Sequence, residues 1–563
     1  MTTTEKPSVS EEERRQFKEE IGRCWPAAKS RWSRFLLLNE PELSSEAHSV
    51  AQIHLGTRQV VLNDELIKSH HLFDCIEGLL SHEVGHHVRY PGTLAVEARM
   101  RLLERSIIPL PEYSLTNLFQ DLMINEFLGD ELRHQFIKVY QSFTSQPAFH
   151  SSHAWKRDPA FLFYLSLFEV LWDLAPGELI GSPESKFAEE FPGYRAEAHV
   201  LVHELFRMEP NIYTQFLYFT SVMTRYLKPM IDDMLQQFNA CQCGADVPTP
   251  EDWADALSLT QGEKDAIERA RNAGWFDEDQ GERLSKLNEL EERIASLPGF
   301  GTDDAVLVPD TMAAYYRQLA EQHLIKPPAL PRWGEAIVPT TLEDWEFGDP
   351  VREIDWMTTL IQRGSELGAV QPMRRVQIPE MEGHEVRLWQ PRMEIYLDVS
   401  GSMPNPIYHL NAMTLAAQIL TLGTTRAGGL VRAALYSTTP VLYWEWCRSE
   451  IEISKFLMHY VGAGTVFPFE LLAKSTDECR DDAPIRVVIS DNDFIHNYNH
   501  HPEARSILIS AIKNGDLILL LHRPDQADID HYQSLGAKVI AIQDFNDFPK
   551  IATQLTRALF PDS

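Results

Sequence analysis

The sequence predicts a multidomain protein with a mainly α-helical N-terminal part and a C-terminal α/β part. Its 563 residues are too many for one ordinary hydrophobic core. From about residue 385 onwards, short apolar runs such as "RMEIYLDVS", "IRVVISD" and "LILLLHR" alternate with helical patterns. This strand–helix alternation predicts a mostly parallel sheet that is covered by helices on both faces.

Changes in residue pattern divide the chain into four predicted segments. Residues 1–240 are expected to be mainly helical, apart from a hairpin around "LGTR" at 55–58. Residues 241–335 carry charged helices with weak apolar faces, which predict a connecting arm. The proline-rich stretch "IKPPALPRWGEAIVPTT" marks a boundary, followed by a β-rich bracing segment at 336–390 and the α/β sheet within 391–563.

Composition restricts the classes of partner. The net charge of −31 argues against nucleic-acid binding, which needs a clustered basic surface. The six scattered cysteines favour a reducing compartment, and the N-terminal residues lack an apolar signal core. The most apolar stretch, "FLFYLSLFEVLWDL", is short and contains Glu169 and Asp173, as in a buried helix. We therefore expect a cytoplasmic protein that binds neither nucleic acid nor membrane.

The stretch "LLSHEVGHHVRYPGT" at 79–93 carries the first chemical motif. His82 and His86 lie four residues apart, on one face of the expected helix, where both imidazoles could bind one metal ion. Glu83 stands beside the first histidine and could exchange a proton with metal-bound water, which is the logic of H-E-x-x-H. Gly85 lowers helix propensity, so we expect a neighbouring group to approach closely there.

A third ligand is expected from the helix that contains "FQDLMIN". Asp121 and Asn125 are four residues apart on one face, so Asp121 could complete the ligand set while Asn125 supports it. Glu126 is the competing ligand, and it points in another direction around the helix.

Together, "HEVGHH" and "QDLMIN" resemble the zincin metallopeptidases, and more closely a metallopeptidase domain that precedes von Willebrand factor A (VWA) domains in some bacterial proteins. The resemblance covers about residues 45–135 and departs from gluzincins by having Asp121 in place of the third glutamate. It implies Zn²⁺ bound by His82, His86 and Asp121, with Glu83 as the catalytic residue. The alternative is a structural zinc site without turnover.

The stretch "MEIYLDVSGSM" carries the second motif. Asp398, Ser400 and Ser402 follow an expected buried strand, and ligands of α/β sheets bind beyond the carboxyl ends of strands. One carboxylate and two hydroxyl groups are hard oxygen donors that suit Mg²⁺.

This D-x-S-x-S pattern resembles the metal-ion-dependent adhesion site of the VWA domain, over about residues 390–558. The resemblance adds Thr465 from "GAGT" and Asp491 from "IRVVISDND" as ligands of Mg²⁺. It also implies that an acidic side chain of a partner protein completes the coordination.

A third segment, "WEFGDPVREIDWMTTLIQRG", resembles a stretch that precedes VWA domains in proteins encoded with MoxR-type AAA+ ATPases. Its matching residues are Asp349, Arg352, Asp355 and Trp356. The combined expectation is a bacterial cytoplasmic adaptor that acts with such an ATPase and binds, cleaves or remodels a protein substrate. A non-catalytic, Mg²⁺-dependent scaffold is the alternative, and a metal-chelatase subunit is a third reading.

Overall fold

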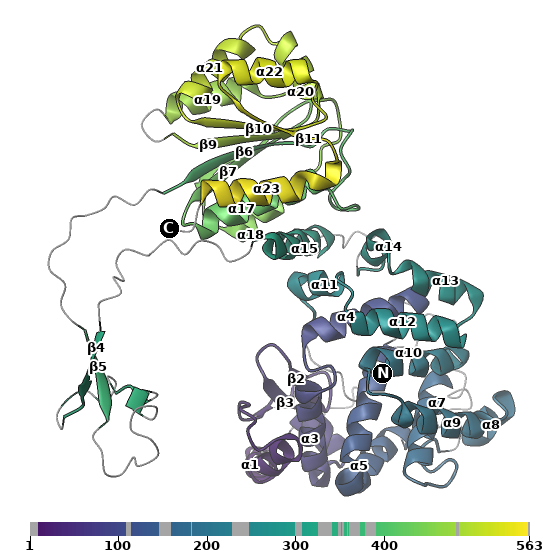
Figure 1. Ribbon diagram of the computed structural model, residues 1–563. Helices are drawn as coiled ribbons and strands as arrows, with labels where there is room; N and C mark the ends of the chain where they lie inside the picture. The colour runs from purple at the N-terminus through teal and green to yellow at the C-terminus, as the bar shows by residue number, and fades with distance from the viewer. Residues whose placement is uncertain are drawn as a thin grey trace. The chain divides into compact units, whose positions relative to one another are not determined.

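The computed structural model of this 563-residue chain divides into two compact units. One comprises Met1–Tyr315 with Ile407–His409, and the other comprises Tyr316–Pro406 with Leu410–Ser563. The first unit is mainly helical and the second contains a six-stranded sheet with helices, which confirms the predicted combination (Figure 1). The structure describes residues 9–108, 114–145, 159–181, 183–227, 247–298, 307–324, 340–346, 349, 351, 354–356, 358–359, 372–377, 390–479 and 483–560.

A small sheet and the first helices surround the H-E-x-x-H segment. The strands run in the order β1 (Glu42–Leu43), β3 (Gln59–Leu62) and β2 (Ala51–His54). The antiparallel pairing of β2 with β3 confirms the predicted hairpin. Helix α1 (Glu11–Trp32), the hairpin and helix α3 (Ile76–Val88) share one apolar core.

Helix α3 is buried along most of its length and packs against the 30-residue helix α5 (Leu115–Thr144). A Cβ atom at Gly85 would lie 2.6 Å from the ring of Trp32 and 2.8 Å from the side chain of Ile124 on α5. The expected close approach at Gly85 is therefore confirmed, and it allows α5 to approach the histidine-bearing helix.

A second apolar core holds most of the other helices of the N-terminal unit. Helix α7, the most apolar, is only 13 residues long, and no helix among the described residues is both long and apolar enough to cross a bilayer. Besides α1, α3 and α5, the described residues before 300 form α2 (Asp64–Ser69), α4 (Leu94–Ile107), α7 (Pro159–Leu171), α8 (Glu184–Glu190), α9 (Tyr194–Arg207), α10 (Ile212–Met223), α11 (Pro250–Ala256), α12 (Gln261–Ala273), α13 (Glu278–Lys286) and α14 (Leu290–Ala295).

The segment predicted as a connecting arm is helical but, over its described residues before Tyr315, belongs to the N-terminal unit. Helix α11 packs against α4, and α12 packs against α10. Arg99 of α4 donates hydrogen bonds to Asp255 and to the buried carboxylate of Glu263. Small apolar residues, Ala266 and Ala270, provide enough of a face for close helix packing, which the charged sequence pattern obscured.

The C-terminal sheet has the strand order β11-β10-β9-β6-β7-β8. All neighbouring strands are parallel except β7 and β8, so the predicted, mostly parallel, Rossmann-like sheet is confirmed. The chain passes from β6 to β7 and β8 on one side of β6 and then returns to β9 on its other side, which makes the carboxyl ends of β6 and β9 a topological switch point. The strands are β6 (Arg392–Asp398), β7 (Leu430–Tyr436), β8 (Val441–Cys447), β9 (Ile485–Ser490), β10 (Asp516–His522) and β11 (Lys538–Ile542).

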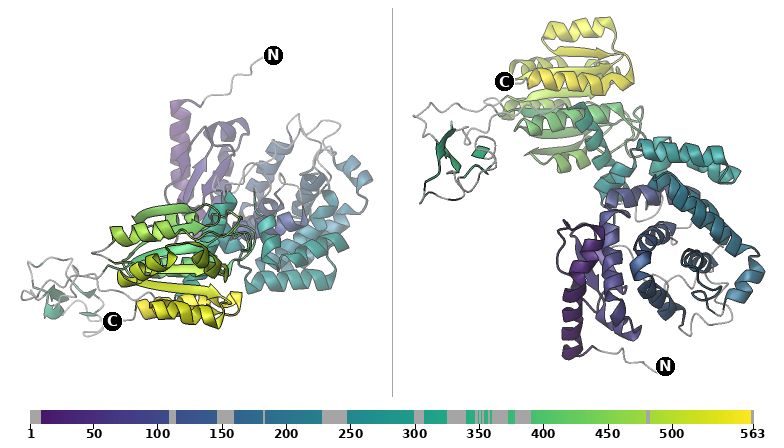
Figure 2. Two further views of the ribbon diagram at one scale, coloured as in Figure 1. Left: turned by 90° about the horizontal axis from the view of Figure 1, so that it is seen from above. Right: turned by 60° about the horizontal axis from the view of Figure 1, so that its bottom comes forward.

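Helices cover both faces of this sheet (Figures 1 and 2). Helices α17 (Ala412–Arg426) and α23 (Phe548–Leu559) pack together on one face. The opposite face carries α19 (Phe469–Glu478), α21 (Ala504–Lys513) and α22 (Gln526–Leu535). Two shorter helices, α18 (Glu450–Phe456) and α20 (Asp493–His500), complete the α/β part, and α15 (Leu307–His323) precedes it.

A buried ion cluster joins the three central strands near their amino ends. Glu394 of β6 accepts hydrogen bonds from Arg432 of β7 at 2.6 Å and from Arg486 of β9 at 3.2 Å. Ser475 of α19 also donates to this carboxylate. Because buried charges are tolerated when they are paired and hydrogen-bonded, these residues fit inside otherwise apolar strands.

The segment predicted to be β-rich contains a two-stranded antiparallel sheet of β4 (Thr340–Asp344) and β5 (Met373–Gln377). Asp349 forms an ion pair with Arg374 of β5 at 2.8 Å. Asp355 accepts hydrogen bonds from the main-chain N–H and the hydroxyl of Thr358. Trp356 is 53% exposed, and Arg352 lies outside the described residues.

We predict that Gly85→Ala destabilises the N-terminal unit, because the added methyl group would displace Trp32 or Ile124. Overpacking of this kind costs about 1–3 kcal/mol of unfolding free energy. The matched control is Gly22→Ala in α1, where nothing lies within 4 Å of the added atom. That control should gain about 0.5–1 kcal/mol from helix propensity. Thermal denaturation distinguishes the two, and equal stability of Gly85→Ala and the unsubstituted chain would refute the packing argument.

Candidate metal centres

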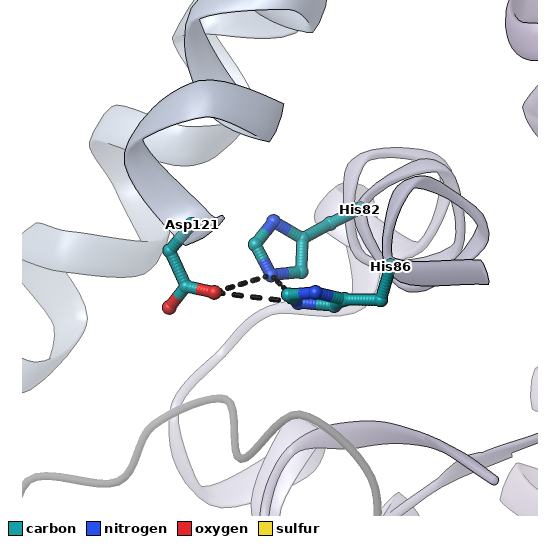
Figure 3. A group of neighbouring side chains, drawn as sticks. All are labelled: His82, His86 and Asp121. Carbon is teal, nitrogen blue, oxygen red and sulfur yellow. Dashed lines mark hydrogen bonds and ion pairs between the residues drawn. The ribbon is translucent and has the colours of Figure 1, made fainter. Parts of the chain in front are cut away.

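Helices α3 and α5 bring the first group of predicted site residues together (Figure 3). His82 and His86 project from α3 toward Asp121 of α5, and all three are buried. Their Nε2 atoms are 3.0 Å apart, and Asp121 Oδ1 lies 3.3 Å from each. We call His82, His86, Asp121 and the adjacent Glu83 the candidate zinc site.

The three ligand atoms have the spacing that a tetrahedral zinc site requires. Zn–N and Zn–O bonds of about 2.0–2.2 Å place neighbouring ligand atoms about 3.3–3.6 Å apart. The observed separations of 3.0 and 3.3 Å fall close to this edge length. One position of the tetrahedron would remain for water or substrate, as in catalytic zinc sites.

Hydrogen bonds at the Nδ1 atoms of His82 and His86 determine the tautomer of each ring, and so leave Nε2 facing the site. His86 Nδ1 lies 2.7 Å from the main-chain oxygen of Tyr90, which can only accept, so Nδ1 carries the proton. His82 Nδ1 lies 2.8 Å from Asn125 Oδ1, and the Asn125 amide donates to the hydroxyl of Tyr140 at 2.9 Å. In neutral rings both Nε2 atoms therefore bear lone pairs. Hydrogen bonds of this kind orient histidines that bind metal ions.

The site attracts a positive charge. Burial disfavours protonation of His82, but the hydrogen bond and negative charge of Asp121 outweigh it and raise the pKa of His82 to about 9. Burial likewise acts against ionisation of Asp121, yet both histidines hold the pKa of its carboxyl below the usual value. A proton or a metal ion can thus neutralise the cluster, and a metal ion would displace the proton.

Glu83 is fully buried beside these residues. Burial raises the pKa of its carboxyl, although the two histidines and the main chain of Ile53 on β2 act in the opposite direction. By hydrogen-bond geometry neither carboxylate oxygen has a partner among the described groups, so the main chain of Ile53 acts on the carboxyl only as a nearby dipole. An unpaired buried carboxylate is costly, and a raised pKa suits a group that takes up and releases a proton.

The structure places Asp121, and not Glu126, against the two histidines. Five residues separate these positions, so their side chains leave α5 in directions about 140° apart. Asn125 supports His82, whereas the expectation was that it supports Asp121. Asn117, one turn earlier on α5, donates to Asp121 Oδ2 at 3.2 Å. The i, i+4 spacing of Asn117 and Asp121 could have revealed this contact, but the contributions of Tyr90 and Tyr140 depend on the fold.

The second group of predicted residues lies at the carboxyl ends of β6 and β9. Asp398 Oδ1 accepts from the main-chain N–H of Ser400 at 3.0 Å. The hydroxyl groups of Ser400 and Ser402 are 3.1 Å apart, and Ser402 donates to Asp491 Oδ2 at 3.1 Å. Ser490, which sequence reasoning missed, donates to Asp398 Oδ2 at 2.9 Å. Four of the predicted residues are therefore joined in one hydrogen-bonded chain.

Thr465, the fifth residue, lines the same surface hollow as Ser402, with a volume of about 670 Å³. The two loops are tied by hydrogen bonds from Gly401 N–H to the Ala463 oxygen at 2.8 Å and from Gly462 N–H to the Val399 oxygen at 3.1 Å. We call Asp398, Ser400, Ser402, Thr465 and Asp491 the candidate magnesium site.

Burial raises the pKa of Asp398 to about 6, and the negative charge of Asp491 adds to this effect, while hydrogen bonds from Ser400 oppose it. Two neighbouring carboxylates with hydroxyl groups between them form an all-oxygen donor set, which fits a hard divalent cation. A bound cation would offset the cost of keeping Asp398 ionised.

Comparisons with known proteins give no family assignment. No family model matches the chain, and no curated protein matches it. Among solved structures, it is similar to a von Willebrand factor type A protein from Catenulispora acidiphila, at 14% identity and a TM-score of 0.23. It is also similar to an aerotolerance-related membrane protein from Bacteroides fragilis NCTC 9343, at 14% identity and a TM-score of 0.22.

Each likeness covers 30% of this chain. The chain spans 42% of the length of the first protein and 99% of the second. At these scores, neither protein's properties transfer to this chain.

We predict that Asp121→Asn weakens zinc binding by more than the roughly 10–100-fold that is usual for loss of a supporting group. Glu126→Gln is the matched control on the same helix and should leave zinc affinity unchanged. Asn125→Ala should lie between them, because it removes the acceptor that orients His82. Competition with a chromophoric chelator measures all three, and a loss of affinity in Glu126→Gln but not in Asp121→Asn would reverse the ligand assignment.

Proposed function

We propose that this chain is a zinc-dependent peptidase of the zincin type joined to a VWA domain that binds a protein partner through Mg²⁺. The observation that carries the first half is the convergence of His82, His86 and Asp121 at tetrahedral spacing, with Glu83 unpaired beside them. The second half rests on Asp398 and its hydrogen-bonded neighbours at the switch point of the sheet.

Zinc held by His82, His86 and Asp121 would act as a Lewis acid toward a peptide carbonyl and its attacking water. Glu83 would accept the proton of that water on its carboxylate and pass it to the leaving amine. Burial raises its pKa, which makes the carboxylate a stronger proton acceptor for the first of these transfers. Asn125 and Tyr90 hold the two imidazoles in the tautomer that presents Nε2.

A second candidate function is a scaffold in which the zinc site is structural. The burial of all four side chains favours it, since His82, Glu83, His86 and Asp121 are at most 7% exposed. Structural zinc sites contribute directly to folding, and an ion buried between α3 and α5 would hold these two helices together.

The proposed partner of the VWA domain is a MoxR-type AAA+ ATPase, and the proposed compartment is the bacterial cytoplasm. The proposal of this partner rests on the sequence resemblance at 345–364, where Asp349 pairs with Arg374 of β5 and Asp355 accepts from Thr358. The ATPase would present an acidic side chain to the candidate magnesium site. In this scheme the VWA domain brings a protein substrate and the ATPase to the peptidase domain.

We predict that Glu83→Gln retains zinc but lowers hydrolysis of a quenched fluorescent casein by about 10²–10⁴-fold, the usual contribution of a general acid–base group. The substitution keeps the shape of the side chain and removes its proton affinity. Zinc content and turnover are measured on the same preparation. If zinc-loaded Glu83→Gln were as active as the unsubstituted chain, Glu83 would have no catalytic role.

We predict that Asp398→Ala abolishes Mg²⁺-dependent capture of a purified MoxR-type ATPase. The matched control is Asp530→Ala on α22, which removes an exposed carboxylate elsewhere in the same part of the chain. Capture that is unaffected by Asp398→Ala, or by chelation of Mg²⁺, would count against the adaptor role.

A further inference from the structure

We propose that the protein segment bound at the candidate magnesium site carries a second acidic side chain, which contacts His496 and His500 of helix α20. This inference rests on the proposed binding function of the site and specifies the chemistry of its partner. The occupant is thus a segment with two acidic residues at a defined spacing.

The surface hollow beside the candidate magnesium site carries the argument. Its walls include Ser402 and Thr465 from the two cation-binding loops. On α20 it is lined by residues 493, 496, 497 and 500, whose spacing places them on one helical face. A partner segment that reaches the cation through this hollow must therefore lie along that face of α20.

The loops and α20 form a fixed wall. Asn497 accepts from the main-chain N–H of Phe467, two residues beyond Thr465, and donates to the main-chain oxygen of Asp493. Its amide groups are thus used within the protein. His496 and His500 are both exposed, so their imidazole rings can contact a partner segment that lies along α20.

The two exposed imidazole rings that line the hollow can donate hydrogen bonds to an acidic occupant. Asp493 is the one carboxylate that lines the hollow, and it adjoins Asp491 at the cation end, where a divalent ion would offset its charge. His500 Nδ1 donates to the main-chain oxygen of His496 at 2.6 Å, which holds the imidazole against the helix. A carboxylate next to an imidazole favours its protonated form, so each group stabilises the charge of the other.

Helix geometry sets the spacing of the two acidic residues. His496 and His500 lie about 4.5 and 10.5 Å beyond Asp493 along the helix axis, at 1.5 Å per residue. An extended peptide advances about 3.3 Å per residue, so the second acidic side chain should follow the first by two or three residues.

Two fluorescein-labelled peptides test this inference with the full chain and Mg²⁺. One is a Gly/Ser peptide with a single aspartate, and the other has two aspartates three residues apart. Fluorescence anisotropy should show the two-aspartate peptide binding about three- to fivefold more tightly, as expected for an exposed ionic contact. In the double variant His496→Gln/His500→Gln, both peptides should bind alike. The matched control is His199→Gln/His203→Gln, another exposed i, i+4 pair on α9, which should keep the full difference.

The outcomes separate this inference from the proposed function. Equal affinities for the unsubstituted chain, or an advantage that persists in His496→Gln/His500→Gln, would overturn the inference and leave Mg²⁺-dependent binding intact. If neither peptide binds in a Mg²⁺-dependent way, the proposed binding function itself fails, and the inference fails with it.

Discussion

The convergence of three lone pairs in a buried space is the constraint on which the N-terminal unit depends. Two imidazole nitrogens and one carboxylate oxygen meet within 3.3 Å of one another, between two tightly packed helices. Without a proton or metal ion among them, these atoms would repel each other in a medium of low dielectric constant. The packing of α3 on α5 is therefore linked to cation binding. Gly85 contributes because its missing side chain lets Ile124, three residues beyond Asp121 on the same helix, come close to α3.

The C-terminal part follows the same principle with different ligands. Asp398 ends the central strand of the sheet, where burial and a second carboxylate disfavour its charged form. The ion cluster around Glu394 lies at the opposite end of the same strands, where arginine side chains supply the compensating charge. At the site end no arginine or lysine takes part in the hydrogen-bonded chain of Asp398, Ser400, Ser402 and Asp491, as far as the described residues extend. A bound cation at this end would compensate the negative charges of Asp398 and Asp491.

Short-range patterns in the sequence predicted the features of the fold and of the two sites that depend only on the geometry of a single helix, strand or turn. The i, i+4 spacing of His82 and His86, the hairpin around residues 55–58 and the position of Asp398 after a strand are all local features. Helical geometry also predicted that Asp121 and Glu126 point in different directions from α5. It did not decide from the sequence alone which of the two faces the histidines. The hydrogen-bond partners of Asn125, and the packing of helices α11, α12 and α13 against α4 and α10, could not be predicted. They arise from contacts between segments far apart in the chain. The charges of Glu394, Arg432 and Arg486 were hidden within apolar runs, since their mutual pairing exists only in the assembled sheet.

The central claim is that α3 and α5 together form a zinc site, and anomalous diffraction at the zinc absorption edge tests it most directly. Crystals of the full chain grown with Zn²⁺ should give an anomalous peak about 2.0–2.2 Å from Nε2 of His82, Nε2 of His86 and Oδ1 of Asp121. An anomalous map with no peak between these three atoms, in crystals grown with Zn²⁺, would contradict the account.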